Sequence, residues 1–147
     1  MGRDKRAGVR RRHDSNLLDS GVLLAAARSV SRDRETALRV LEDSERTFLT
    51  SAFIQLEVLP KAVFHKKALV RAFYDEYFRA AEWIRDIEAI VSGAEADAAR
   101  LGLSAMDALH LAAAQLGGAE EFLTTESRQR PIHRAQWVRV KCIFERF

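Results

Sequence analysis

The sequence predicts an α/β fold built on a mainly parallel sheet. Short apolar runs typical of buried strands alternate along the chain with longer runs of strong helix formers. This alternation is typical of parallel strands joined by helical crossovers. The chain has 147 residues, of which 48% are apolar, and that composition suits a single domain with a buried core.

The first predicted strand runs from Asn16 to Leu18, and Asp19 follows it at the junction with a helical run from Val22 to Arg28. Asp is a good N-cap, so Asp19 has an ordinary structural interpretation. Asp33 is placed to cap a second helix, after which the chain returns to a strand-like run at Thr47 to Thr50. These elements make a first strand, helix, strand unit.

Ser51 is placed to cap the next helix, in which Glu57 stands among apolar residues. Burying an unpaired charge costs several kcal/mol. Glu57 therefore either pairs with a basic residue at the helix edge or serves as a ligand, and the sequence leaves both interpretations open. Pro60 is expected to weaken or kink this helix beyond Glu57.

An aromatic-rich amphipathic helix is predicted from Lys66 to Ala81, with its aromatic side chains in the core or in a partner interface. A brief extended piece at 83–84 precedes a helix from Ile87 to Leu101 that ends at Gly102. Ser104 then caps the most strongly predicted helix, residues 105–116, whose apolar positions cover nearly its whole circumference. We expect this helix to be buried.

Asp107 lies in the first turn of the 105–116 helix, with the spacing from Ser104 that a capping box requires. An acid at this position also complements the helix dipole, so a structural role is sufficient to explain it. His110 on the same helix is interpreted as a core histidine rather than a metal ligand. A short buried strand is predicted at Phe122 to Thr125, and Glu126 follows it.

The last predicted element is a half-exposed edge strand at 137–143, where apolar and basic residues alternate with a period of two. Four acidic residues lie near the carboxyl ends of the predicted strands or in the helices that follow those strands. They are Asp19, Glu57, Asp107 and Glu126. Parallel α/β sheets bind their ligands at that edge. Carboxylates without cysteine ligands favour Mg²⁺ or Mn²⁺, which can activate water for attack on a phosphodiester.

Charge is distributed unevenly along the chain. Residues 1–14 carry a net charge of +4, residues 127–147 carry +5, and the 112 residues between them carry −6. We expect residues 1–14 to form a basic mobile arm and residues 15–147 to form the domain. The basic ends suit polyanion binding, although basic tails also serve only for solubility.

Cysteine and hydropathy patterns predict a cytoplasmic protein with no membrane association. The single Cys142 cannot form an internal disulfide, and no apolar run has the length needed to cross a bilayer. The basic N-terminal segment lacks the apolar run of a signal peptide. The sequence has no glycine-rich phosphate-binding loop, and its Ser, His and Asp residues show no spacing that would bring them together as a nucleophilic triad.

Four segments resemble the acidic motifs of the PIN-domain nucleases, a family that includes the VapC-type toxins of bacterial toxin–antitoxin pairs. They are Leu17 to Leu23, Leu56 to Leu59, Met106 to Ala112, which is the most specific, and Phe122 to Glu126. The resemblance extends over about Asn16 to Ile143. It implies a three-layer α/β/α sandwich around the sheet and Mg²⁺ or Mn²⁺ as the cofactor.

By this resemblance Asp19, Glu57, Asp107 and Glu126 would be the catalytic metal ligands of an endoribonuclease that cleaves RNA. Many members have Asp where Glu126 stands and a further acid shortly after it, which this chain lacks, so a second metal is in question. Homodimerisation and an antitoxin partner are also implied. Five arginines are expected to bind RNA: Arg11, Arg12, Arg128, Arg130 and Arg134.

Two alternative functions remain at the level of sequence. One is a catalytically weak or inactive module that keeps the fold and binds nucleic acid. The other is a protein-interaction module that uses the aromatic helix around Phe73 and Tyr77, with the acids serving only as helix caps.

Overall fold

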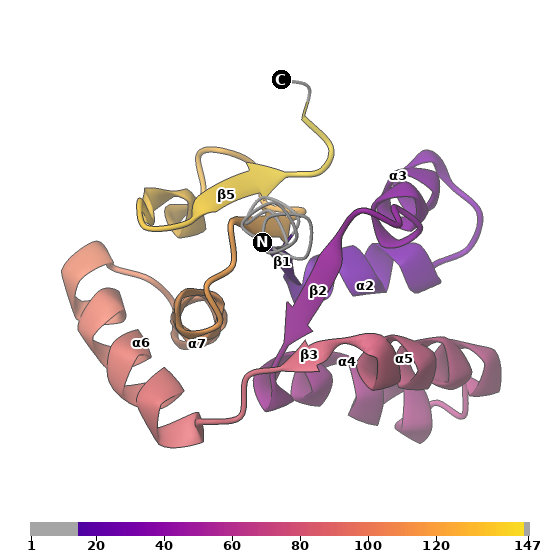
Figure 1. The fold of residues 1–147 in the computed structure, drawn as a ribbon. Coiled ribbons are helices and arrows are strands. Elements are labelled where there is room, and N and C mark those ends of the chain that lie inside the picture. Colours follow the sequence, from indigo (N-terminus) through magenta and orange to yellow (C-terminus); the bar gives the residue numbers. More distant parts are fainter. Residues whose placement is uncertain (1–14, 146–147) are drawn as a thin grey trace, which may run out of the picture.

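Residues 15–145 are described by the computed structural model, and their strands form one five-stranded sheet in the order β3-β2-β1-β4-β5 (Figure 1). Every strand pair is parallel, as the sequence predicts. The strands are β1 (Ser15–Leu18), β2 (Thr47–Thr50), β3 (Glu82–Trp83), β4 (Glu121–Thr124) and β5 (Arg139–Cys142). The predicted arm at 1–14 lies outside the described residues.

Helices cover both faces of the sheet, which makes the predicted three-layer α/β/α sandwich. Figure 1 shows α6 and α7 on one side of the sheet and the helices from α2 to α5 on the other. Their bounds are α2 (Ser20–Ala27), α3 (Arg32–Leu41), α4 (Ala52–Phe64), α5 (Ala68–Ala80), α6 (Ile87–Leu101) and α7 (Ala105–Leu116), followed by the 3₁₀ helix η2 (Pro131–Arg134). In the described part of the chain, none of the helices has the length and apolarity that crossing a membrane demands.

Helix caps account for where most of these helices begin. Asp19, Ser51 and Ser104 are the N-caps of α2, α4 and α7, as predicted. The prediction that Asp33 caps α3 is wrong. Ser31 is the N-cap of α3, and its hydroxyl oxygen accepts a hydrogen bond from the Arg34 backbone N–H at 3.1 Å. Asp33 lies in the first turn of α3 instead, where its charge still favours the helix dipole.

Pro60 does not end α4, which continues to Phe64. Pro60 lacks the backbone N–H that would bond to the Leu56 carbonyl one turn earlier. Both residues are exposed, and Leu56 retains 65% of its accessible surface. Water can therefore satisfy the freed carbonyl, and the remaining hydrogen bonds of the helix persist.

Strand register brings the start of α2 against the end of β4. Leu17 pairs with Phe122 and Leu18 with Leu123 in the parallel ladder between β1 and β4, and these four side chains are almost fully buried. The contact with β4 is close, because a Cβ at Gly21 would lie 2.4 Å from the Thr125 hydroxyl oxygen. Glycine at this position lets the residues after β1 lie beside those after β4.

The two C-terminal strands differ from the prediction only at their ends. β4 begins one residue earlier than expected, at Glu121, and β5 begins at Arg139 rather than near Trp137. β5 is an edge strand that pairs only with β4 among the described residues. Their carboxyl ends, like those of β1 and β2, point to the same edge of the sheet.

Candidate metal centre

Three side chains from distant parts of the chain meet at the carboxyl edge of the sheet. Asp19 follows β1, Glu57 projects from α4, and His110 projects from α7. One ligand atom from each of these side chains lies within 4.8 Å of the other two. Opposite oxygen ligands of one Mg²⁺ are about 4.2 Å apart, twice the metal–oxygen distance of about 2.1 Å, so the cluster has the dimensions of a site for a single ion.

Asp19 is both a helix cap and a member of this cluster. Its Oδ1 accepts the Ser20 backbone N–H at 2.9 Å, and its Oδ2 accepts the Thr124 hydroxyl at 2.8 Å. Only 7% of the residue is exposed. Burial raises the pKa of Asp19, and the charge of Asp107 adds to the rise, while His110 and Thr124 oppose it. The two hydrogen bonds fix the carboxylate and leave further lone pairs on each oxygen.

Glu57 and His110 form the closest contact of the cluster, with 2.7 Å between Glu57 Oε1 and His110 Nε2. This hydrogen bond is the largest cause that lowers the pKa of Glu57, and burial opposes it. His110 is 1% exposed, whereas the Glu57 side chain is 31% exposed. His110 Nδ1 has no hydrogen-bond partner among the described residues. Glu57 is thus held by a buried histidine rather than by a basic residue at the helix edge.

His110 is the residue that sequence reasoning placed correctly in the core but did not assign to the site. A usable signal was its position three residues after Asp107 on the same helix, since residues three apart lie on one face of a helix. Its contact with Glu57 spans 53 positions of sequence. Spacing within one helix could not show that contact.

Asp107 is half-buried in the first turn of α7, and its backbone N–H donates to the Ser104 hydroxyl at 3.2 Å. The predicted cap is therefore present. Burial raises the pKa of Asp107, and the charges of Glu126 and Glu57 raise it further against the effects of Ser104 and His110. Asp107 lies outside the three-residue cluster but within the electrostatic range of its carboxylates.

Glu126 differs from the other acids because a guanidinium already holds it. Its Oε1 accepts the Arg130 Nε–H at 3.0 Å, and its side chain is 40% exposed. The backbone N–H of Glu126 donates to the Thr124 hydroxyl oxygen at 3.0 Å, so the loop after β4 is tied to the residue that positions Asp19. The structure places Glu126 within electrostatic range of Asp107 but in an ion pair of its own.

These residues fit a divalent cation. Two carboxylates and an imidazole converge from different elements, and a third carboxylate raises the pKa of one of them. Mutual repulsion and burial both penalise the charged forms, and a dication would relieve both effects. Carboxylate oxygens suit Mg²⁺ and Mn²⁺, and the His110 Nε2 atom is already engaged by Glu57.

The three arginines predicted to bind RNA that the structure describes are exposed, but each has a partner within the chain. Arg128 pairs with Glu145 at 2.9 Å and Arg130 with Glu126. Arg134 donates to the Leu101 carbonyl at 2.7 Å. Arg11 and Arg12 lie outside the described residues.

The fold and this acidic centre agree with the family comparison. The family model of the PIN domain matches residues 17–134, and the chain belongs to the PIN domain family. No curated protein matches the sequence.

Solved structures similar to this fold include several toxin and toxin–antitoxin structures. VapBC2 from Rickettsia felis, bound to a DNA fragment from their promoter, gives a TM-score of 0.65 at 14% identity, covering 87% of this chain and 98% of that chain. VapC20 from Mycobacterium tuberculosis, a sarcin-ricin loop cleaving toxin, gives 0.61 at 12% identity, covering 73% and 86%. A toxin–antitoxin complex from Klebsiella pneumoniae gives 0.62 at 22% identity, covering 78% and 90%.

Proposed function

We propose that this protein is a metal-dependent endoribonuclease that cleaves RNA phosphodiester bonds. The observation that carries the proposal is the convergence of Asp19, Glu57 and His110 at the carboxyl edge of a PIN domain, with Asp107 in electrostatic range. Capping explains Asp19 and Asp107 separately, but it does not explain why Glu57 joins them.

In this proposal Asp19, Glu57 and Asp107 hold Mg²⁺ or Mn²⁺, which supplies a Lewis acid for the phosphate and a bound water of lowered pKa. Thr124 and the Ser20 backbone N–H fix the orientation of the Asp19 carboxylate. His110 fixes Glu57 in the same way. Orientation of ligands by neighbouring hydrogen bonds is a common requirement of metal sites.

Glu126 is proposed as the fourth acid of the site, but in a weaker role. Arg130 already neutralises its carboxylate, and a second cation near Glu126 would compete with that guanidinium. We therefore propose activity with a single bound ion. The same ion pair is the observation that favours the alternative, a PIN-like module of weak or no activity that binds nucleic acid.

We also propose that the protein is the toxin of a toxin–antitoxin pair, acts in the cytoplasm and forms homodimers. Support for the pairing comes from the toxin–antitoxin complexes among the structural neighbours. The test is to co-express the chain with the product of the neighbouring reading frame. Loss of RNA cleavage in the purified complex supports the pairing, and undiminished cleavage without complex formation contradicts it.

The experiment for the nuclease itself is incubation of purified protein with single-stranded and structured RNA in Mn²⁺, Mg²⁺ or EDTA. Cleavage with metal, none with EDTA, and loss of cleavage in Asp19→Asn and Asp107→Asn are expected. Asp33→Asn serves as the matched control, since Asp33 is an exposed acid in the first turn of α3. Cleavage that survives in both site variants would show a contaminating nuclease.

A further inference from the structure

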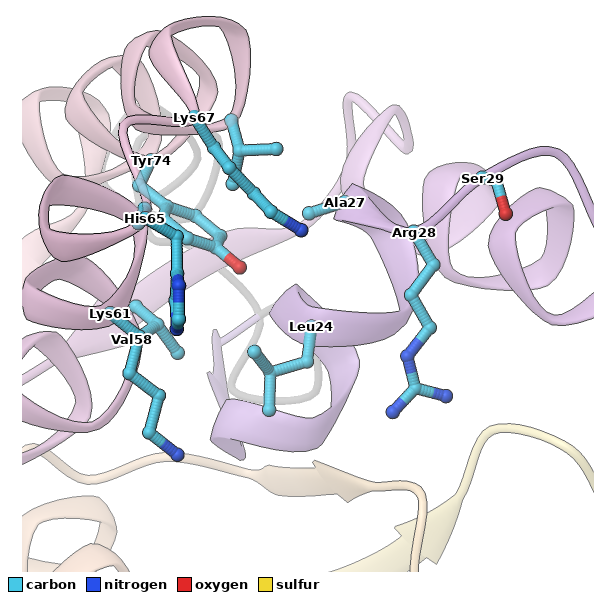
Figure 2. Close-up of a pocket in the computed structure, with 11 residues that line it drawn as sticks. Leu24, Ala27, Arg28, Ser29, Val58, Lys61, His65, Lys67 and Tyr74 are labelled. Carbon is cyan, nitrogen blue, oxygen red and sulfur yellow. The ribbon is translucent and has the colours of Figure 1, made fainter.

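A pocket of about 480 Å³ lies between α2 and the α4–α5 pair, outside the acidic cluster (Figure 2). Its polar lining side chains are those of Arg28 and Ser29 at the end of α2, Lys61 in α4, His65 and Lys67 in the turn between α4 and α5, and Tyr74 on α5. None of the residues that line it is acidic. Its volume is within the range of small-ligand sites.

The cations of this basic pocket form no ion pair with a carboxylate. Among residues 15–145, Arg28, Lys61 and Lys67 form no ion pair, although other arginines of the fold do so. His65 contacts the ring of Phe64 edge-on, with 5.0 Å between ring centroids. Positive charges gathered in a concave surface whose lining holds no carboxylate create a local field that attracts anions.

Tyr74 adds a neutral donor to these charges. The residue is 2% exposed, and Figure 2 shows its hydroxyl pointing into the pocket beneath the Lys67 side chain. The charge of Arg28 lowers the pKa of Tyr74 against the larger effect of burial, so Arg28 and the Tyr74 hydroxyl are within electrostatic range across the pocket. An anion between them would receive charge and a hydrogen bond together.

The basic pocket adjoins the candidate metal centre. Lys61 lies four residues after Glu57 on α4, so the two side chains project from the same face about one turn apart, roughly 6 Å along the axis. The charge of Lys61 also contributes to the lowered pKa of Glu57. A phosphate in the pocket and a phosphodiester at the metal centre could therefore belong to one backbone.

We propose that this basic pocket binds a backbone phosphate of the RNA next to the phosphodiester positioned at the metal centre. This inference rests on the proposed nuclease function and names where its substrate is held. A phosphate fits the pocket better than a base does, since the buried ring of Tyr74 offers its hydroxyl rather than an open face for stacking. An acidic peptide would not explain why the pocket lies one helical turn from the metal centre.

The test measures binding of a fluorescein-labelled 12-nucleotide RNA by anisotropy, in the Asp107→Asn background so that no cleavage occurs. Arg28→Gln and Lys61→Gln are each expected to weaken binding about fivefold at 0.1 M salt, because one phosphate contact on a single strand contributes a salt slope of about 0.7. The slope of log Kd against log salt should fall by about that amount in each variant. Tyr74→Phe, which keeps the ring, is expected to weaken binding less.

Arg79→Gln is the matched control. Arg79 lies in the last turn of α5, is exposed and forms no ion pair among the described residues, and it is about 18 Å along the helix from Lys67. The RNA affinity and the salt slope of Arg79→Gln should match those of the Asp107→Asn protein without a pocket substitution. If Arg28→Gln and Lys61→Gln also match the parent while their melting temperatures are unchanged, the inference is overturned.

Two further measurements distinguish phosphate binding from protein docking and from the nuclease activity itself. If the Arg28→Gln/Lys61→Gln double variant keeps its RNA affinity but loses affinity for a ten-residue polyglutamate peptide, the pocket is a protein-docking site and the inference is wrong. If the wild type cleaves RNA but the pocket variants bind and cleave like it, only this inference fails. If the protein never cleaves RNA, yet binding depends on the pocket as stated, the inference holds and the nuclease proposal fails.

Discussion

Two candidate roles of Asp107, an acid that complements the dipole of α7 in its first turn and a metal ligand, predict opposite effects of one substitution. Asp107→Asn removes a half-buried charge that Glu126 and Glu57 repel, so we expect the metal-free melting temperature to rise by roughly 2–4 °C, about 1 kcal/mol in a chain of this size. It should also abolish stabilisation by Mn²⁺. Thermal unfolding with and without Mn²⁺ measures both effects.

A cap alone predicts the reverse, a modest loss of stability of about 1 kcal/mol or less and no metal effect. Asp33→Asn again provides the control, because it neutralises an exposed acid in the first turn of another helix. If the melting temperature falls by the same amount in Asp107→Asn and in Asp33→Asn, Asp107 only stabilises the start of its helix and does not bind metal.

The stabilisation of Asp107→Asn should depend on pH in a defined direction. Because the pKa of Asp107 is raised above 3.8 in the folded state, the folded protein binds more protons than the unfolded chain between those two pKa values. Stability is then lost as the pH rises through the folded pKa. The difference in melting temperature between variant and wild type should grow from pH 4 to pH 7, and a constant difference would contradict this account.

His110 tests whether positioning of Glu57 matters for metal binding. His110→Ala leaves the Glu57 carboxylate without its 2.7 Å partner, and loss of such a partner typically costs 10- to 100-fold in metal affinity. Isothermal titration with Mn²⁺ measures the loss. His110→Gln, which keeps a side-chain donor, should recover part of the affinity, and equal affinities for all three proteins would exclude a positioning role.

The individual acids could be singled out as candidates from local signals: Asp19, Asp107 and Glu126 from a strand end or a helix start, and Glu57 from its apolar neighbours in α4. The partners of those acids could not. The Glu57–His110 contact and the ion pairs of the buried Glu121 with Arg46 and Arg139, at 3.2 and 3.4 Å, join separate parts of the chain. Such contacts depend on how helices and strands pack, which the pattern of one segment does not contain.

At the scale of elements, the end of α4 contains a strained residue. Lys66 has a φ of 55°, in the left-handed region where glycine is favoured, while the Lys67 N–H donates to the Ala62 carbonyl at 3.0 Å to close the helix end. Lys66→Gly should raise the melting temperature by roughly 2–4 °C, because a side chain in this conformation costs about 1 kcal/mol.

Lys67→Gly is the matched control for this prediction, since Lys67 has a φ of −89° and gains nothing from glycine. Its melting temperature should fall or stay the same, because glycine adds entropy to the unfolded chain. A fall for Lys66→Gly as large as that for Lys67→Gly would show that the left-handed conformation carries no strain.

Element boundaries were predictable where a cap or a change of period marks them, as at Ser51, Ser104 and Gly102. The start of α3 and the continuation of α4 past Pro60 have physical causes that local sequence does not reveal. Ser31 and Asp33 are both good N-cap residues, so the local sequence does not decide which of them begins α3. In the structure the N-cap is Ser31. Pro60 is tolerated because the carbonyl it leaves unbonded belongs to an exposed residue, and exposure is a property of the folded molecule.

Over the whole molecule, charge is separated between an acidic body and basic ends. Residues 15–126 carry −6, whereas the segments before and after carry +4 and +5. The acidic body includes the carboxylates of the candidate metal centre, whose negative charge repels a polyanion. The basic pocket and the basic ends are therefore the parts of the sequence suited to attract the RNA of the proposed function.

The salt dependence of RNA binding tests how much residues 1–14 contribute to RNA affinity. Removing Met1 to Asp14 deletes six basic residues, and each phosphate contact that is lost should lower the slope of log Kd against log salt by roughly 0.7. A full-length variant with those six residues changed to Gln should reproduce the effect, because charge rather than chain length is responsible. If affinity and slope are the same for all three proteins, the segment does not contact RNA, and attraction must come from the folded domain, where the pocket variants Arg28→Gln and Lys61→Gln measure it directly.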